Sequence, residues 1–152
     1  MVYVEAPNIV PRTDRSLFLA GSITGSRQWQ SDLCDKIKTL DIVVYNPRRA
    51  NFPIHDPHAA YGQIKWEYER LRDAGAISFW FAKETIGPIV LFEIGAWSMT
   101  KKPILVGVEP GYQRAQDVEI QLGLVRPEVR IRKTLDDLAN DVILHFRALK
   151  YL

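Results

Sequence analysis

The sequence predicts an α/β domain with a flavodoxin-like, doubly wound sheet of five parallel strands in the order 2-1-3-4-5 and helices on both faces. Two observations lead to this prediction. Short, continuous apolar runs, typical of strands buried on both faces, alternate with longer segments whose apolar residues recur every three or four positions. In addition, 152 residues suffice for one domain of this kind with a substantial core.

The N-terminal part is predicted to contain an arm, a strand and a helix. Residues 1–15 hold two prolines and little periodicity, which indicates an extended arm before a single domain at 16–152. The apolar run 16–20 leads into a glycine turn that begins at Gly21, so we expect a buried strand there. Apolar residues at helical spacing then predict a helix over about 27–40.

The middle of the chain repeats this strand and helix pattern. Residues 42–45 are predicted to form the second strand, which stops before Pro47 because proline cannot continue a central strand. A loop rich in proline and polar groups spans about 48–57. Apolar residues at helical intervals follow over 64–75, and the run 76–81 predicts the third strand.

The C-terminal part completes the alternation. A helix is predicted over 88–100. Its first residue is a proline, which is well tolerated in that position. The fourth strand is expected at 104–108, a short helix near 115–122 and a short fifth strand at 129–131. The last helix begins at residue 134, with two aspartates in its first turn, where the helix dipole favours them.

Composition and charge exclude several classes of protein. Twenty basic residues against eighteen acidic ones give a charge of +2, which is too balanced to indicate a nucleic-acid or membrane surface. The single cysteine, Cys34, lies in a helical apolar pattern and is interpreted as a small buried hydrophobe. The three histidines lack metal or catalytic spacing, so no metal site is predicted. No apolar run reaches membrane length and no signal peptide opens the chain, so a cytoplasmic location is the default.

Glu93 is the most informative residue for chemistry. Its neighbours at helical spacing, among them Val90, Ala96 and Trp97, are apolar. Burying a carboxylate among such residues is costly, which suggests a functional reason for it. The alternative is that Glu93 lies on an exposed edge near the N-terminus of its helix, where acids are favoured.

Further candidates lie where parallel sheets bind ligands, beyond the carboxyl ends of the strands. Glu67, near the start of the preceding helix, is a second candidate acid, with a solvated helix face as the alternative. The glycine turn offers backbone N–H groups and hydroxyls to a sugar or a phosphate, although a plain tight turn is equally compatible with it. The candidate binding residues are Gly21, Ser22, Thr24, Asn46 and Arg48, with Trp29 as a stacking surface.

Taken together, these segments resemble the nucleoside 2-deoxyribosyltransferase superfamily. Residues 91–96, Leu-Phe-Glu-Ile-Gly-Ala, are similar to its nucleophile signature, and residues 19–25 are similar to the first turn of the related deoxynucleotide N-hydrolases. Residues 46–49 and 63–67 resemble a bacterial and phage branch of the transferases. The resemblance covers about residues 16–108 and implies the same flavodoxin-like fold.

The resemblance implies an activity and roles for the two acids. Glu93 would be the nucleophile that exchanges the base of a 2′-deoxynucleoside through a covalent deoxyribosyl-glutamate, with retention of configuration. Glu67 falls 26 positions before it, where the family usually has aspartate, and would contact or protonate the base. The implied partners are a 2′-deoxynucleoside and a free nucleobase in nucleotide salvage, with no cofactor, no nucleic-acid polymer and no membrane. Family sites lie at subunit contacts, which implies a homo-oligomer.

Two departures from the family keep other functions open. Thr24 stands where the related hydrolases commonly have an arginine for the 5′-phosphate, and Gly87 stands where the transferases have a base-contacting aspartate. The first alternative is an N-glycoside hydrolase of 2′-deoxynucleoside 5′-phosphates or other nucleotides, which a phosphate pocket with Arg48 or Arg49 would favour. The second is a non-catalytic nucleotide-binding module, which an exposed Glu93 would favour.

Overall fold

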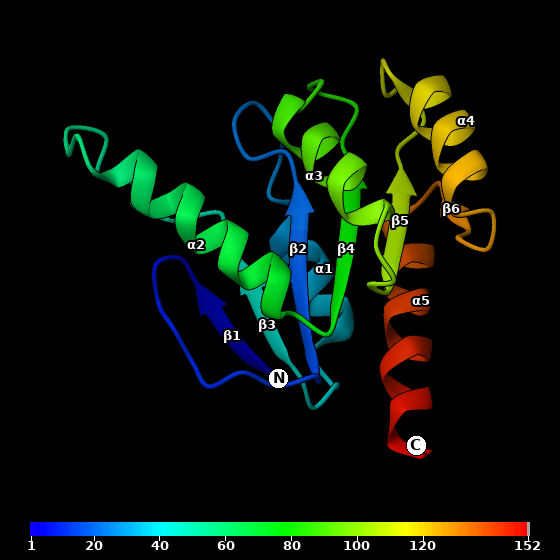
Figure 1. Cartoon of the computed structure of the whole chain (residues 1–152), viewed down its shortest axis with the longest axis horizontal. Coiled ribbons are helices and arrows are strands. Elements are labelled where there is room, and N and C mark those ends of the chain that lie inside the picture. Colours follow the sequence, from blue (N-terminus) through cyan, green and yellow to red (C-terminus); the bar gives the residue numbers. More distant parts are fainter. Residues whose placement is uncertain (152) are drawn as a thin grey trace.

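The sheet has six parallel strands in a computed structural model that describes residues 1–151 (Figure 1). Their order is β1-β3-β2-β4-β5-β6, so the predicted five-stranded sheet with the order 2-1-3-4-5 is wrong. The strands are β1 (Val2–Glu5), β2 (Ser16–Gly21), β3 (Val43–Asn46), β4 (Ala76–Phe81), β5 (Ile104–Val108) and β6 (Ile131–Arg132). The helices in the same range are α1 (Trp29–Ile37), α2 (Ala59–Asp73), α3 (Pro88–Ser98), α4 (Ala115–Val125) and α5 (Leu135–Ala148), followed by a 3₁₀ turn, Leu149–Tyr151.

The additional strand is β1, which lies within the segment expected to be an extended arm. It pairs in parallel with β3, with Val2 opposite Val43 and Glu5 opposite Asn46, and so forms one edge of the sheet. The remaining strands follow the order β3-β2-β4-β5-β6. Four residues are too few to show a clear alternation of apolar and polar positions, and the strand is stabilised by backbone hydrogen bonds to a distant segment.

The helices cover both faces of the sheet, as predicted (Figure 1). On one face, α2, α3 and α4 bury an apolar core that includes Trp66, Ile94 and Val118. On the other face, α1 packs against α5 in a second core that includes Trp29 and Phe146. The central strand β4 is buried along its whole length, which explains its continuous apolar run.

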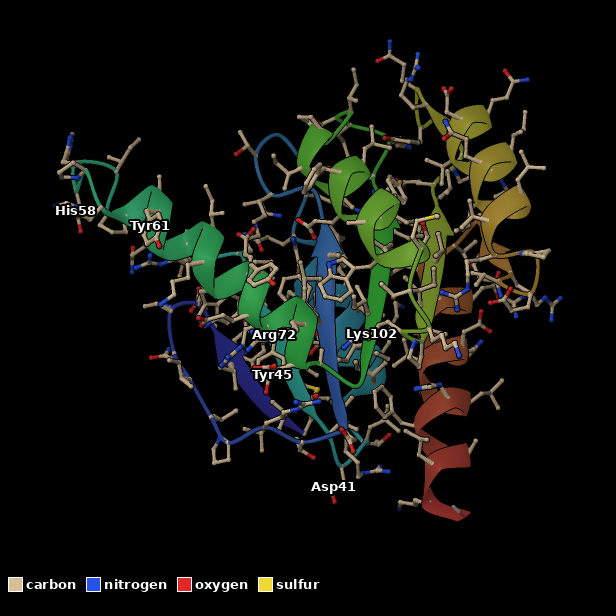
Figure 2. The ribbon with its side chains drawn as sticks, in the orientation of Figure 1. Asp41, Tyr45, His58, Tyr61, Arg72 and Lys102 are labelled. Carbon is tan, nitrogen blue, oxygen red and sulfur yellow. The ribbon has the colours of Figure 1, made fainter. Side chains whose placement is uncertain are left out.

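Helix α2 begins at Ala59, several residues earlier than its apolar pattern predicts. Its N-terminal end projects from the sheet, and Figure 2 shows His58 and Tyr61 there, far from Tyr45 and Arg72. Tyr61 is 72% exposed. A helical segment that packs against so little of its own chain has no apolar face turned towards the core, so periodicity cannot reveal it.

Candidate active site

Two acidic side chains, Glu67 on α2 and Glu93 on α3, lie close together on the same face of the sheet. Trp66 anchors α2 because its ring packs against Phe18 of β2 and Tyr45 of β3, with ring centroids 6.2 and 6.4 Å away. Glu67 comes directly after this anchor, and its charge acts on Glu93 across the space between the two helices. We call Glu67 and Glu93 the acidic pair.

Glu93 is half-buried, with its carboxylate turned away from solvent on one side. Its Oε2 atom is buried and has no hydrogen-bond partner among residues 1–151. Burial, assisted by the negative charge of Glu67, raises the pKa of Glu93 to about 8. The expected alternative, a solvated carboxylate on an exposed edge of the helix, is therefore not what the structure contains.

Burial also raises the pKa of Glu67, but a hydrogen bond from Gln63 opposes this effect by stabilising the ionised form. Near neutral pH, burial therefore favours the protonated form of Glu93, while the hydrogen bond from Gln63 favours the ionised form of Glu67. A carboxylic acid beside a carboxylate is the arrangement that glycoside-cleaving enzymes use for acid and nucleophile.

A third buried polar group, the Ser22 hydroxyl, lies at the N-terminal end of α3. Its Oγ atom has no hydrogen-bond partner within the described residues. Gly87, the residue before α3, has a φ of +61°, and a Cβ added there would lie only 2.3 Å from Ser22 Oγ. Position 87 thus has neither the backbone conformation nor the space for a side chain. The Ser22 hydroxyl occupies the place that such a side chain would take.

Arg48 holds the loop after β2 in place. Its guanidinium group donates to the carbonyl oxygens of Ser26 (2.9 Å) and Arg27 (2.7 Å) and to Gln30 Oε1 (3.1 Å). The carbonyl oxygen of Ser22 in turn accepts from the Gln30 amide and from two other side chains. Both terminal nitrogens of Arg48 are thus engaged within the chain, and its structural role is to brace the loop that presents Ser22.

Trp29 does not offer a stacking surface. It is fully buried in the core beneath α1, and its indole N–H donates to the Ser22 carbonyl oxygen at 3.0 Å. Gly21 is needed for this packing, since a Cβ there would lie 2.3 Å from the Trp29 ring. Thr24 is exposed at the tip of the turn.

Asn46 is buried at the end of β3, and its amide is engaged on both sides. Its Nδ2 donates to the Tyr3 hydroxyl (2.7 Å), and its Oδ1 accepts from the backbone N–H of Arg48 (3.0 Å). The first bond depends on β1, which the sequence did not reveal. Of the predicted binding residues, Ser22 alone has a polar atom that is buried and unpaired.

The loops after β2, β4 and β5 are tied together by charged groups. Arg27 pairs with Glu84 (3.2 Å) and with Glu109 (2.8 Å), and Glu109 Oε2 accepts the backbone N–H of Lys83. These contacts join three of the loops that were expected to meet at the carboxyl edge of the sheet.

One cavity lies away from the acidic pair. It has a volume of about 390 Å³ and lies between α3 and α4, where Leu91, Gly95 and Leu122 line it. Residues 91 and 95 lie on the side of α3 opposite Glu93, given the 100° rotation per residue of a helix. Within residues 1–151 no cluster of potential ligands could hold a metal ion, and no helix is both long and apolar enough to cross a bilayer.

Gln63 is a site residue that sequence reasoning did not single out. Its Nε2 donates to the Pro47 carbonyl oxygen and to Glu67 Oε1, both at 2.8 Å. Its Oε1 is buried and unpaired in the described part of the chain. The available signal was its position four residues before Glu67, a spacing at which helical side chains meet.

A comparison with known proteins identifies a family for most of the chain. A family model described as nucleoside 2-deoxyribosyltransferase like matches residues 14–112, a segment that includes the acidic pair, Gln63, Ser22 and Gly87. No curated protein sequence matches the chain significantly.

Proposed function

Because the chain belongs to the nucleoside 2-deoxyribosyltransferase-like family, we propose that it exchanges the base of a 2′-deoxynucleoside through a covalent bond to Glu93. The observation that carries this proposal is the acidic pair, two half-buried glutamates with raised pKa values on helices α2 and α3. Strongly perturbed pKa values of this kind are frequent at catalytic sites.

For the reaction, the proton of the acidic pair has to lie on Glu67, so that Glu93 is ionised. In the first step, an oxygen of this Glu93 carboxylate attacks the anomeric carbon, and the bond from this carbon to the base breaks. The bonding electron pair leaves with the base, which takes a proton from Glu67. In the second step, an acceptor base attacks the anomeric carbon, the bond to Glu93 breaks, and the proton of the acceptor returns to Glu67. Two inversions give net retention, and water in place of the acceptor gives hydrolysis.

The buried polar groups suggest an orientation for the substrate. Ser22 lies beside Gly87 at the start of α3, about 9 Å along the helix axis from Glu93, at 1.5 Å per residue. The base, in contrast, leaves towards Glu67 on α2. The Ser22 hydroxyl then binds the 5′-hydroxyl of the sugar. Because Arg48 is engaged within the chain, we propose a nucleoside rather than a 5′-phosphate as the substrate.

Base exchange is tested directly by chromatography. The purified protein is incubated with each of the common 2′-deoxynucleosides and a different free base. We expect a new deoxynucleoside from the wild type and none from Glu93→Ala. Glu69→Gln is a matched acidic control, because Glu69 lies on α2 but pairs with Lys65.

The products separate the alternatives. Free base and deoxyribose that form at the same rate with or without acceptor would identify a hydrolase and contradict the transfer step. Turnover confined to 2′-deoxynucleoside 5′-phosphates would contradict the choice of a nucleoside. If neither substrate class reacted, a non-catalytic binding module would replace the enzyme.

The proposal includes a homo-oligomer, supported by apolar side chains that remain exposed on the face carrying the acidic pair. Phe92 of α3 is 75% exposed, and Ile64 of α2 is 67% exposed. Further examples on these helices, on α4 and directly after α3 are Tyr61, Tyr68, Ile89, Met99, Ile120 and Leu124. Exposed apolar surface of this kind marks interfaces.

We therefore expect sedimentation velocity to show an oligomer that Phe92→Asp shifts towards a monomer. Lys38→Asp, on an exposed residue at the end of α1, is the control and is expected to leave the oligomer intact. A wild type that sediments as a monomer at all concentrations would contradict the homo-oligomer.

A further inference from the structure

The side-chain amide of Gln63 has a fixed orientation. Its Nε2 donates both hydrogens, one to the Pro47 carbonyl oxygen and one to Glu67 Oε1, at 2.8 Å each. Turning the amide over would place Oε1 against two acceptors and would lose both bonds. Gln63 Oε1 is therefore held as a hydrogen-bond acceptor that cannot exchange places with a donor.

This acceptor has no partner in residues 1–151, although it is buried. Leaving a buried acceptor unpaired costs about 1–3 kcal/mol. A ligand that supplies a donor removes this cost, whereas a ligand that supplies a second acceptor adds repulsion. Gln63 Oε1 is thus suited to distinguish donors from acceptors.

The position of Gln63 relative to the acidic pair indicates which part of the substrate it meets. It lies one helical turn before Glu67 on α2, about 6 Å along the axis. Ser22 lies next to Gly87, the residue before the other helix, α3. If the base leaves towards Glu67, Gln63 lies near the edge of the base that is far from the sugar, where nucleobases carry an exocyclic amino or oxo group.

We propose that Gln63 Oε1 accepts a hydrogen bond from the exocyclic amino group of the nucleobase, so that the site prefers cytosine and adenine to uracil and hypoxanthine. This inference rests on the proposed function. An oxo group at the same place meets the fixed acceptor and leaves it unpaired. The missing side chain at position 87 makes Gln63 the group of this chain that reads the base.

The test compares kcat/KM for 2′-deoxycytidine against 2′-deoxyuridine, and for 2′-deoxyadenosine against 2′-deoxyinosine. We expect the wild type to favour the amino-bearing member of each pair by roughly tenfold to a hundredfold, as an unpaired buried acceptor implies. Gln63→Met keeps the length of the side chain and its helix propensity but removes the acceptor, so both ratios should approach one. Lys65→Met, on an exposed residue of the same helix, should keep the wild-type ratios.

Binding of free bases, measured by calorimetry, keeps the inference testable without turnover. We expect cytosine to bind more tightly than uracil to the wild type and equally to Gln63→Met, with both proteins checked for an unchanged melting temperature. Two results would overturn the role of Gln63 but not the transferase. The first is turnover in which the wild-type kcat/KM ratios are near one, and the second is turnover in which Gln63→Met leaves these ratios unchanged. Absence of turnover would overturn the proposed function, and equal binding of the two bases by the wild type would then overturn the inference as well.

Discussion

A protein in which Glu93 is replaced by glutamine is expected to lose base exchange and, at the same time, to become more stable at pH 8. An amide cannot form the covalent bond to the anomeric carbon, so the rate should fall by roughly a thousandfold or more, as when other enzymes lose their nucleophile. Chromatography of the exchange products measures the loss.

The gain in stability follows from the pKa of Glu93. Unfolding lets this pKa return from about 8 to 4.5, so between these values the folded chain holds a proton that the unfolded chain does not. Stability of the wild type therefore falls as the pH rises from 4.5 to 8, with a slope of about 1.4 kcal/mol per pH unit. Below pH 4.5 both states are protonated and the penalty vanishes.

Glutamine carries no charge and does not have this penalty. We expect Glu93→Gln to gain about 2–4 kcal/mol at pH 8, which corresponds to roughly 5–15 °C in Tm for a chain of this size. The two proteins should melt together at pH 4.5. Scanning calorimetry at pH 4.5, 6 and 8 measures the difference, with Glu69→Gln as the control for loss of an ion-paired acid. A difference in Tm that did not grow with pH would contradict the buried, protonated state of Glu93.

The strands with long apolar runs could be predicted from the sequence because burial on both faces leaves a local pattern. The run 76–81 coincides with β4, and 104–108 coincides with β5. Strand β1 left no such pattern, because it depends on pairing with β3, about forty residues away. The strand number and order were wrong for this reason.

In the candidate site, too, features with a local sequence pattern could be predicted, whereas tertiary contacts could not. The apolar neighbours of Glu93 pointed to burial, and the spacing to Glu67 followed from a family resemblance. The orientation of the Gln63 amide could not be predicted, because it depends on Pro47, which precedes it by sixteen residues across a loop. The contact of Ser22 with Gly87 joins two loops that the sheet brings together, and the engagement of Arg48 is likewise a tertiary effect.

Replacing Glu67 with glutamine is expected to lower kcat/KM by about a hundredfold to ten-thousandfold for natural 2′-deoxynucleosides, the range typical of a lost general acid. The loss should depend on the leaving group. In 7-methyl-2′-deoxyguanosine the base carries a positive charge and leaves without taking a proton, so Glu67→Gln should retain most of the wild-type activity on this substrate. Glu69→Gln should behave as the wild type on both.

The dependence of these rates on pH provides a second, independent signature of the acidic pair. On natural substrates the wild-type rate should decline as the pH passes about 8, where the pair loses its remaining proton. On 7-methyl-2′-deoxyguanosine, Glu67→Gln has no acid to lose, so its rate should rise with pH as Glu93 ionises, over the pH range in which the base keeps its positive charge. Stopped assays between pH 5 and 10 on natural substrates, and between pH 5 and 7 on the methylated one, distinguish the two profiles. If Glu67 donates a proton, its removal should do little harm when the leaving base needs no proton. An equal loss of activity on both substrates would therefore mean that Glu67 shapes the site without donating a proton.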